Sequence, residues 1–123
     1  MKLSLETRYH GDVVVVQCHG CIVYRDEAIA FSRRVGEILA DESKIILDLG
    51  GVTSIDGAGM GELILLYRWA RTIGAQLIYA SPRSFVRHTL GLTRLDSFLE
   101  VHSSLSAALA ALQLEPEKIC AQC

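Results

Sequence analysis

The stretch from Lys44 to Gly61 reads KIILDLGGVTSIDGAGMG, and most of what the sequence predicts depends on it. It starts with an apolar run, Ile45 to Leu49, that is typical of a buried strand. A glycine-rich loop follows, carries a single carboxylate at Asp56 and opens directly into a long apolar helix. Such a loop exposes backbone N–H groups and a helix N-terminus, where a phosphate or an acidic group of a partner is stabilised. We therefore expect a binding surface where this helix begins.

Around this unit, the apolar pattern alternates between strand spacing and helix spacing. Strands are expected over residues 3–9, 13–18, 45–49, 76–80 and 98–102. Helices are expected over residues 25–40, 58–73 and 82–90, with a last helix that Ser103 or Ser104 caps and that runs to Leu112. The resulting order, ββαβαβαβα, predicts a single-domain α/β fold in which helices flank a mainly parallel or mixed sheet.

Glycine, serine and proline positions predict where several elements end. Gly20 is expected to end the second strand, and Gly74 to cap the C-terminus of the second helix. Ser81 and Pro82 favour a helix start, with serine at the N-cap and proline at the first helical position. Pro116 disfavours an extension of the last helix, so residues 1–113 are predicted as the domain and residues 114–123 as a C-terminal tail.

Composition excludes several classes of protein. The 123 residues suit one domain, and half of them are hydrophobic, enough for a core without metal ions or disulfides. The formal net charge of −2 argues against a nucleic-acid-binding surface, which is usually clearly basic. No apolar run approaches the roughly 18 residues of a membrane span, and the N-terminus shows no long apolar signal segment. These features predict a soluble cytoplasmic protein that does not insert into membranes.

The four cysteines form two pairs with C-x-x-C spacing: Cys18, Cys21, Cys120 and Cys123. Residues three apart on a strand point to opposite faces, so Cys18 and Cys21 are poorly placed for a shared redox or metal site. Cys18 continues the apolar alternation of the second strand and is expected in the core. A zinc site with the second pair requires the tail to fold back, and chain length does not exclude this. We expect reduced thiols, no metal and no other cofactor.

Asp56 has two compatible interpretations. Locally, its carboxylate is expected to cap a backbone N–H near the start of the second helix. It also belongs to the surface that a partner would contact. Catalysis by Asp56 alone is not expected, because no nearby histidine, lysine or second carboxylate is fixed by the sequence. The residues therefore indicate a binding protein rather than an enzyme.

The second helix has two faces when its residues are placed about 100° apart. A broad face is expected in the core: Met60, Leu63, Ile64, Leu66, Tyr67, Ala70 and Ile73. Leu65 and Trp69 fall on the other side. They are either buried by a wide packing surface, exposed singly, or a secondary contact for a partner or a second copy. A homodimer is therefore an open alternative.

The stretch around Asp56 resembles the signature of the family of sulfate-transporter and anti-sigma-factor-antagonist (STAS) domains. The matching positions are Asp48-Leu49, Val52, Ile55-Asp56, Gly59 and Gly61. Gly20-x-Ile22 and Leu90-Gly91-Leu92 match weaker marks of the family elsewhere in the chain. The resemblance covers residues 3–112 and implies the same order of strands and helices.

Several positions depart from the family signature. Gly57 and Ala58 replace two serines, so the usual phospho-acceptor position, Gly57, has no hydroxyl. Met60 replaces a leucine, and Val23 stands where many antagonists carry an aspartate. Thr53 and Ser54 lie upstream and do not align with the acceptor. The departures predict that the serine phospho-switch of the family is missing.

The resemblance implies a non-enzymatic module for protein interaction, similar to anti-sigma factor antagonists. Its partner is then an anti-sigma factor or a related kinase-like ATPase domain, bound without the serine phospho-switch. The expected contact loop consists of Asp56, Gly57, Ala58, Gly59 and Met60. The alternatives are a STAS subunit of another complex, of the stress-signalling or lipid-transport type, and a relative that has lost its partner.

Overall fold

The computed structural model describes residues 3–112, apart from the side chain of Asp96. The elements are β1 (Ser4–His10), β2 (Val13–Ile22), α1 (Arg25–Asp41), β3 (Lys44–Ile55), α2 (Gly57–Thr72), β4 (Gln76–Ala80), α3 (Ser84–Leu92), the 3-10 turn η1 (Leu95–Ser97), β5 (Val101–His102) and a helix over residues 105–112. The predicted order ββαβαβαβα is confirmed. The predicted tail, residues 114–123, lies outside the described residues.

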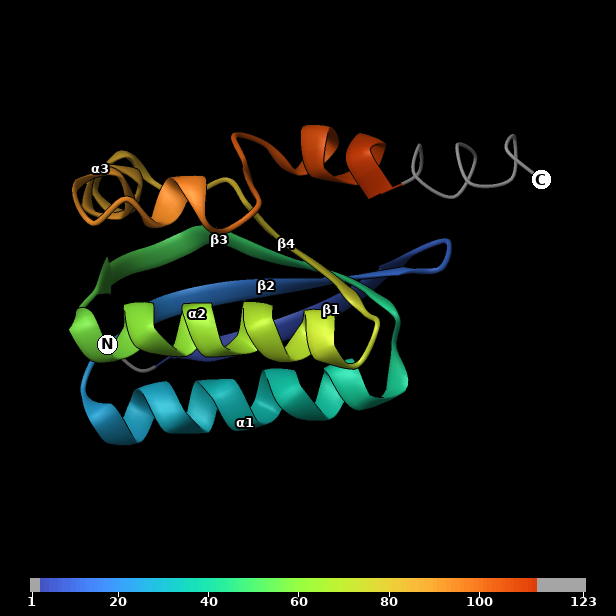
Figure 1. Ribbon diagram of the computed structural model, residues 1–123, viewed down its shortest axis with the longest axis horizontal. Helices are drawn as coiled ribbons and strands as arrows, with labels where there is room; N and C mark the ends of the chain where they lie inside the picture. Colours follow the sequence, from blue (N-terminus) through green and yellow to red (C-terminus); the bar gives the residue numbers. More distant parts are fainter. Residues whose placement is uncertain (1–2, 113–123) are drawn as a thin grey trace.

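One five-stranded sheet, in the order β1-β2-β3-β4-β5, forms the centre of the domain. β1 pairs antiparallel with β2, and all other neighbours are parallel, so the sheet is mixed. α1 and α2 cover one face, and α3 and the helix over residues 105–112 lie on the other (Figure 1). The prediction of an α/β domain with helices flanking a mixed sheet is confirmed.

Alternate residues of the central strands build the core on both faces. Towards α1 and α2 they include Val14, Val16, Cys18, Ile45 and Leu47. On the other face, Val13, Val15, Ile46 and Ile78 pack with Ala108 and Leu112 of the last helix. Strands buried on both sides explain why the sequence shows continuous apolar runs rather than a strict alternation.

The two longest strands continue past their predicted ends. Gly20 lies inside β2, at φ 111° and at a shift in the β2–β3 register, and pairing resumes to Ile22. β3 likewise runs through Gly50 and Gly51 instead of ending at Leu49. A Cβ on Gly51 would lie 2.5 Å from the carbonyl oxygen of Cys18, so this glycine permits close approach of β2 and β3 within a strand.

The end of α2 agrees with the prediction for Gly74. Gly74 has a φ of 80°, its N–H donates to the Arg71 carbonyl oxygen, and the N–H of Ala75 donates to the Ala70 carbonyl oxygen. These two bonds satisfy carbonyl groups at the helix end, as in the Schellman motif. The expected core position of Ile73 is wrong, because this side chain is 44% exposed beside the cap.

The predicted start of α3 is wrong. The helix begins at Ser84, because Ser81 has a φ of 57° and its N–H donates to the His102 carbonyl oxygen. This bond extends the contact between β4 and β5, so Ser81 and Pro82 belong to the connection. β5 also begins later than expected, at Val101. Ser104 is the cap of the last helix, since its Oγ accepts the N–H of Ala107 at 3.1 Å.

Candidate functional site

The carboxylate of Asp56 holds the starts of two helices. Its Oδ1 accepts the N–H of Gly59 at 2.9 Å, which caps α2 as the sequence predicts. Its Oδ2 accepts the N–H of Tyr24 at 2.9 Å, directly before α1. A single side chain therefore fixes the loop after β2 against the loop after β3.

These hydrogen bonds stabilise the charged form of Asp56. The N–H of Gly59, followed by that of Tyr24, holds the pKa of the carboxyl group below its ordinary value. Asp56 is therefore an anion at neutral pH, and each of its oxygens already accepts a backbone donor. This is the arrangement of a structural carboxylate that shapes a surface.

Tyr24 was not identified from the sequence as part of this site. Its backbone has a φ of 64°, a left-handed conformation that is unfavourable for a residue with a side chain. In this conformation the N–H of Tyr24 donates to Asp56 Oδ2, and the tyrosine side chain is 71% exposed. No local pattern marks the position, because the contact joins residues 32 apart in the chain.

The two glycines in the first turn of α2 have opposite surroundings. Gly57 is exposed, and a Cβ placed on it meets nothing within 4 Å. Gly59 is buried, and a Cβ there collides with the carbonyl oxygen of Ile22 and lies 2.7 Å from Ile55 Cγ1. Gly59 therefore allows α2 to pack closely against the ends of β2 and β3, whereas Gly57 leaves open space above the helix start.

The other predicted contact residues surround Gly57. Asp56, Ala58 and Met60 are half-buried, and Ala58 and Met60 pack against the core. The part of the expected contact loop that is freely accessible is therefore centred on Gly57. It forms a small surface at the N-terminus of α2 from which few side chains protrude.

A shallow hollow of about 410 Å³ lies beside Asp56. It is lined by Cys21, Val23, Tyr24, Glu27, Ser54 and Asp56. Val23, which replaces the aspartate of many family members, thus lies in this hollow and adds no charge to it. The Sγ of Cys21 lies 3.5 Å from Thr53 Oγ1, and the hydroxyls of Ser54 and Thr53 lower the pKa of this thiol.

The Cys18–Cys21 pair is divided between core and surface. Cys18 is fully buried, which raises the pKa of its thiol to about 12. Both cysteines are free thiols. Within residues 3–112, no cluster of three or more histidine, cysteine, aspartate or glutamate side chains is arranged to hold a metal ion. Cys120 and Cys123 lie outside the described residues.

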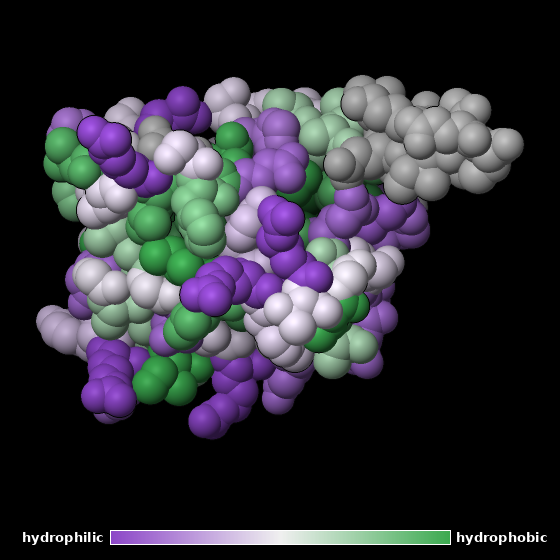
Figure 2. Space-filling model, in the orientation of Figure 1, coloured by the Kyte–Doolittle hydropathy of each residue, from purple (hydrophilic) through white to green (hydrophobic). Residues whose placement is uncertain are grey.

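Leu65 and Trp69 lie one turn apart on α2 and are 55% and 41% exposed. Trp69 leans towards α1, since its Cζ3 would lie 3.7 Å from a Cβ on Gly36. On the side of the molecule drawn in Figure 2, apolar and polar side chains are interspersed. Trp69 is therefore partly packed between the helices and partly accessible, and Leu65 is mainly accessible.

No helix of the described chain, residues 3–112, is long and apolar enough to cross a membrane.

Comparison with known proteins identifies a matching family. The model of the STAS domain matches residues 4–108. A Thermotoga neapolitana protein named as an anti-sigma factor antagonist, the homologue of TM1081, is 30% identical over 71 residues, or 58% of this chain. The match spans 63% of that relative, less than two thirds of its length.

Solved structures also share the fold. The crystal structure of an anti-sigma factor antagonist from Mycobacterium paratuberculosis has a TM-score of 0.81 and 23% identity, covering 91% of this chain and 95% of that chain. The crystal structure of TM1081 from Thermotoga maritima, which is described as an anti-sigma factor antagonist, has a TM-score of 0.76 and 24% identity, covering 89% of this chain and 94% of that chain. At these identities the likeness establishes the architecture.

Proposed function

The chain belongs to the STAS domain family, and we propose that it is a non-enzymatic binding module similar to anti-sigma factor antagonists. Its partner is an anti-sigma factor or a related kinase-like ATPase domain. Binding would sequester this partner and release a sigma factor. The relative from Thermotoga neapolitana, which is named as an antagonist, supports this proposal.

The observation that carries the proposal is the open surface at the start of α2. Asp56 holds this helix start against the Tyr24 loop through two 2.9 Å hydrogen bonds. Gly57 lies at the centre of the surface, is exposed and has free space around its Cα. A partner can therefore approach the backbone closely without reordering the loop, which lowers the entropic cost of association.

The module acts without the serine phospho-switch. Phosphorylation adds a charge of about −1.5 to −2 and three strong acceptors, enough to disrupt an interface. Gly57 and Ala58 have no hydroxyl to accept phosphate. Of the upstream hydroxyls in β3, that of Thr53 donates to the Gly20 carbonyl oxygen at 3.3 Å. With no phosphate added at this position, the occupancy of the complex is set by the affinity and by the concentrations of the two proteins.

Leu65 and Trp69 form a secondary contact surface in this proposal. They lie on the same helix as Gly57 and carry apolar side chains that remain partly accessible. Aromatic side chains such as tryptophan often contribute strongly to binding energy at interfaces. The contact at Gly57 is the primary one and is tested directly.

The test replaces Gly57 by aspartate. The substitution places a negative charge at the centre of the surface, and an unpaired charge buried at an interface typically costs several kcal/mol of binding. We expect affinity for kinase-type anti-sigma factors, measured by titration calorimetry, to fall at least about 100-fold, with an unchanged melting temperature. Ala110→Asp, at an exposed position of the helix over residues 105–112 on the other face of the sheet, adds the same charge far from the loop and is the control.

Two outcomes contradict the proposal. The assignment of this loop as the partner contact is wrong if Gly57→Asp binds as tightly as the unmodified protein while its fold is intact. The proposal that the phospho-switch is absent is wrong if incubation with the partner and ATP places stoichiometric phosphate on Thr53 or Ser54, as measured by phosphopeptide mapping.

A further inference from the structure

β1 is a regular strand with one open edge. Within the described chain it pairs only with β2, so the opposite edge of its seven residues faces outwards. The β1–β2 register runs from Ser4 to His10 without a shift, and no proline interrupts it. Natural proteins usually protect such edges with bulges, prolines or short strands. The other edge of this sheet has that protection, because β5 is only two residues long.

The hairpin determines which backbone groups of β1 face outwards. A two-residue turn, with Gly11 at a φ of 64°, joins His10 to its partner Val13. Residues that flank such a turn form a hydrogen-bonded pair, and hydrogen-bonded and non-hydrogen-bonded pairs alternate along antiparallel strands. The even-numbered residues of β1 therefore bond to β2. The N–H and C=O groups of Leu5, Thr7 and Tyr9 point to the open edge.

We propose that the open edge of β1 pairs with the same edge of a second copy, antiparallel and centred on Thr7. This register joins Thr7 to Thr7 and Leu5 to Tyr9 of the second copy, so all three outward-facing residues find partners. It also places Glu6 opposite Arg8 in both halves of the pair. These are non-hydrogen-bonded positions, where opposing side chains lie close together and opposite charges attract.

Charge selects this register over its neighbours. A shift of two residues in either direction also pairs the outward-facing backbone groups. Centring on Glu6, however, places Glu6 opposite Glu6, and centring on Arg8 places Arg8 opposite Arg8. Like charges directly opposite each other are destabilising. The strand is thus self-complementary in one register, as a twofold-symmetric interface requires.

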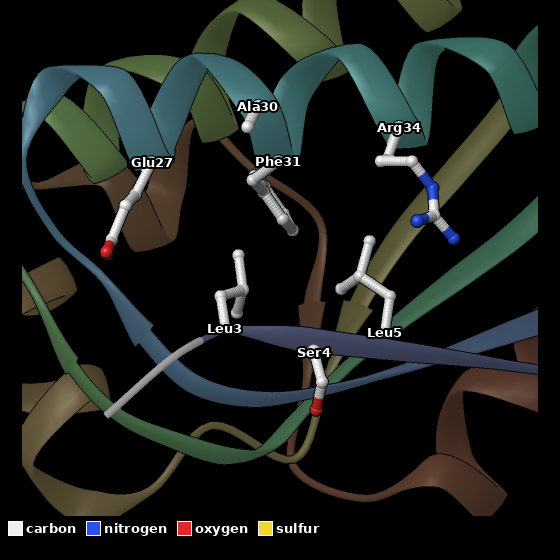
Figure 3. A pocket seen from close by; sticks show the side chains of 7 residues that line it. All are labelled: Leu3, Ser4, Leu5, Glu27, Ala30, Phe31 and Arg34. Carbon is white, nitrogen blue, oxygen red and sulfur yellow. The ribbon is translucent and has the colours of Figure 1, made fainter.

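A groove beside β1 fits the aromatic side chain that this pairing supplies. Figure 3 shows Leu3, directly before β1, and Leu5 of β1 pointing towards Phe31 of α1, with Glu27 and Arg34 at the two ends. These residues, with Ser4 and Ala30, line a volume of about 480 Å³.

Tyr9 of the second copy reaches this groove. Tyr9 lies on the same face as Leu5, because their β2 partners, Val14 and Cys18, both belong to the core beneath α1. In the proposed register, Tyr9 of the second copy lies opposite Leu5, at the edge of the groove. The ring, 66% exposed in the single chain, would bury part of its apolar surface there.

Charge reversal tests both the dimer and its register. The full chain is examined by analytical ultracentrifugation over a concentration series, with its thiols kept reduced so that disulfide-linked dimers do not form. We expect Glu6→Arg and Arg8→Glu each to raise the dissociation constant about tenfold or more, because each creates two like-charge pairs. The double variant restores both pairs and should return to within about twofold of the unmodified protein. Arg87→Glu, at an exposed position of α3 on the other face of the sheet, repeats the charge change away from β1 and should have no effect.

Amide hydrogen exchange gives a second readout within one strand. The N–H groups of Leu5, Thr7 and Tyr9 should exchange fast in dilute protein and slowly in concentrated protein. The N–H groups of Glu6 and Arg8, which bond to β2, should be protected at both concentrations. A protein that stays monomeric throughout, with the edge and groove left to another protein or a small apolar ligand, overturns the proposal. A dimer that is insensitive to both charge reversals, or that fails to recover in the double variant, also overturns it.

Discussion

The start of α2 and the open edge of β1 differ in how their backbone groups are hydrogen-bonded. At the start of α2, Asp56 accepts the N–H groups of Gly59 and Tyr24, and Gly59 packs directly against Ile22. At the β1 edge, the outward groups of Thr7 and its alternate neighbours have no strand beside them in the described chain. At the start of α2 the chain itself satisfies these backbone groups, whereas at the β1 edge no other strand of the described chain does.

The difference shows that these two surfaces suit different kinds of contact. The start of α2 is held by two hydrogen bonds to Asp56 and presents no side chain at Gly57, so a partner must match its shape. The β1 edge offers a repeating row of donors and acceptors, so any well-aligned strand can pair with it, and side-chain charge must provide the specificity. The two surfaces belong to different elements and adjoin at Glu27, which lines both the hollow beside Asp56 and the groove beside β1.

The largest effect is expected from a substitution at Gly59, which packs the start of α2 against β2. Gly59→Ala places a methyl group against the Ile22 carbonyl oxygen and should destabilise the fold by about 3 kcal/mol, or about 10 °C in melting temperature. Gly57→Ala, two residues earlier, is the matched control. Its methyl group points into open space, so stability should hold or rise by up to about 0.5 kcal/mol. Calorimetric melting of the two variants measures the difference. Equal melting temperatures would show that the helix start is looser than its packing implies.

A smaller effect tests the alternation along β1. Arg8→Pro removes an N–H that points to β2 and leaves the buried strand residue Val15 without its donor, which should cost about 2 kcal/mol. Thr7→Pro removes an outward N–H instead and should cost less than about 1 kcal/mol, because proline is tolerated on the open side of an edge strand. Urea unfolding of dilute protein measures both. The alternation is wrong if Thr7→Pro proves the more damaging change.

The fold followed from the sequence where the signal was local. The apolar run of β4 and the glycine that closes α2 lie within a few residues of the features that they determine, and both were predicted correctly. The ends of β2 and β3 were predicted too early, because Gly20 lies at a register shift within the paired strands and Gly51 lies where the two strands approach closely. Only the pairing of the two strands distinguishes that use of glycine from a loop.

The candidate site also has a part that local sequence predicts and a part that it does not. The cap by Asp56 was predictable, because an aspartate three residues before the capped N–H is a local pattern. Its bond to Tyr24 was not, since it joins two loops that only the parallel pairing of β2 and β3 brings together. The open edge of β1 depends on the order of the whole sheet. No sequence window around β1 contains that information.

The smallest expected effect is a change of stability with pH, which can be compared between the two regions because each contains a carboxylate with a lowered pKa. Asp56 at α2 and Asp12 in the β1–β2 hairpin both have lowered pKa values, Asp56 through the N–H groups of Gly59 and Tyr24, and Asp12 mainly through its hydrogen bond with Lys44 at 2.9 Å. A lowered pKa in the folded state means that each group contributes stability above its unfolded pKa and loses it as the pH falls through the folded value. We therefore expect the stability advantage of the unmodified protein over Asp56→Asn to be constant from pH 7 to about pH 5 and to shrink below about pH 4. The same comparison with Asp12→Asn should give a smaller change, because the Asp12 side chain is 73% exposed and its ion pair is screened by water and salt. Urea unfolding across this pH range, at low and high salt, measures both curves. An advantage over Asp56→Asn that does not decrease in acid would show that Asp56 does not hold the two helix starts together as an anion.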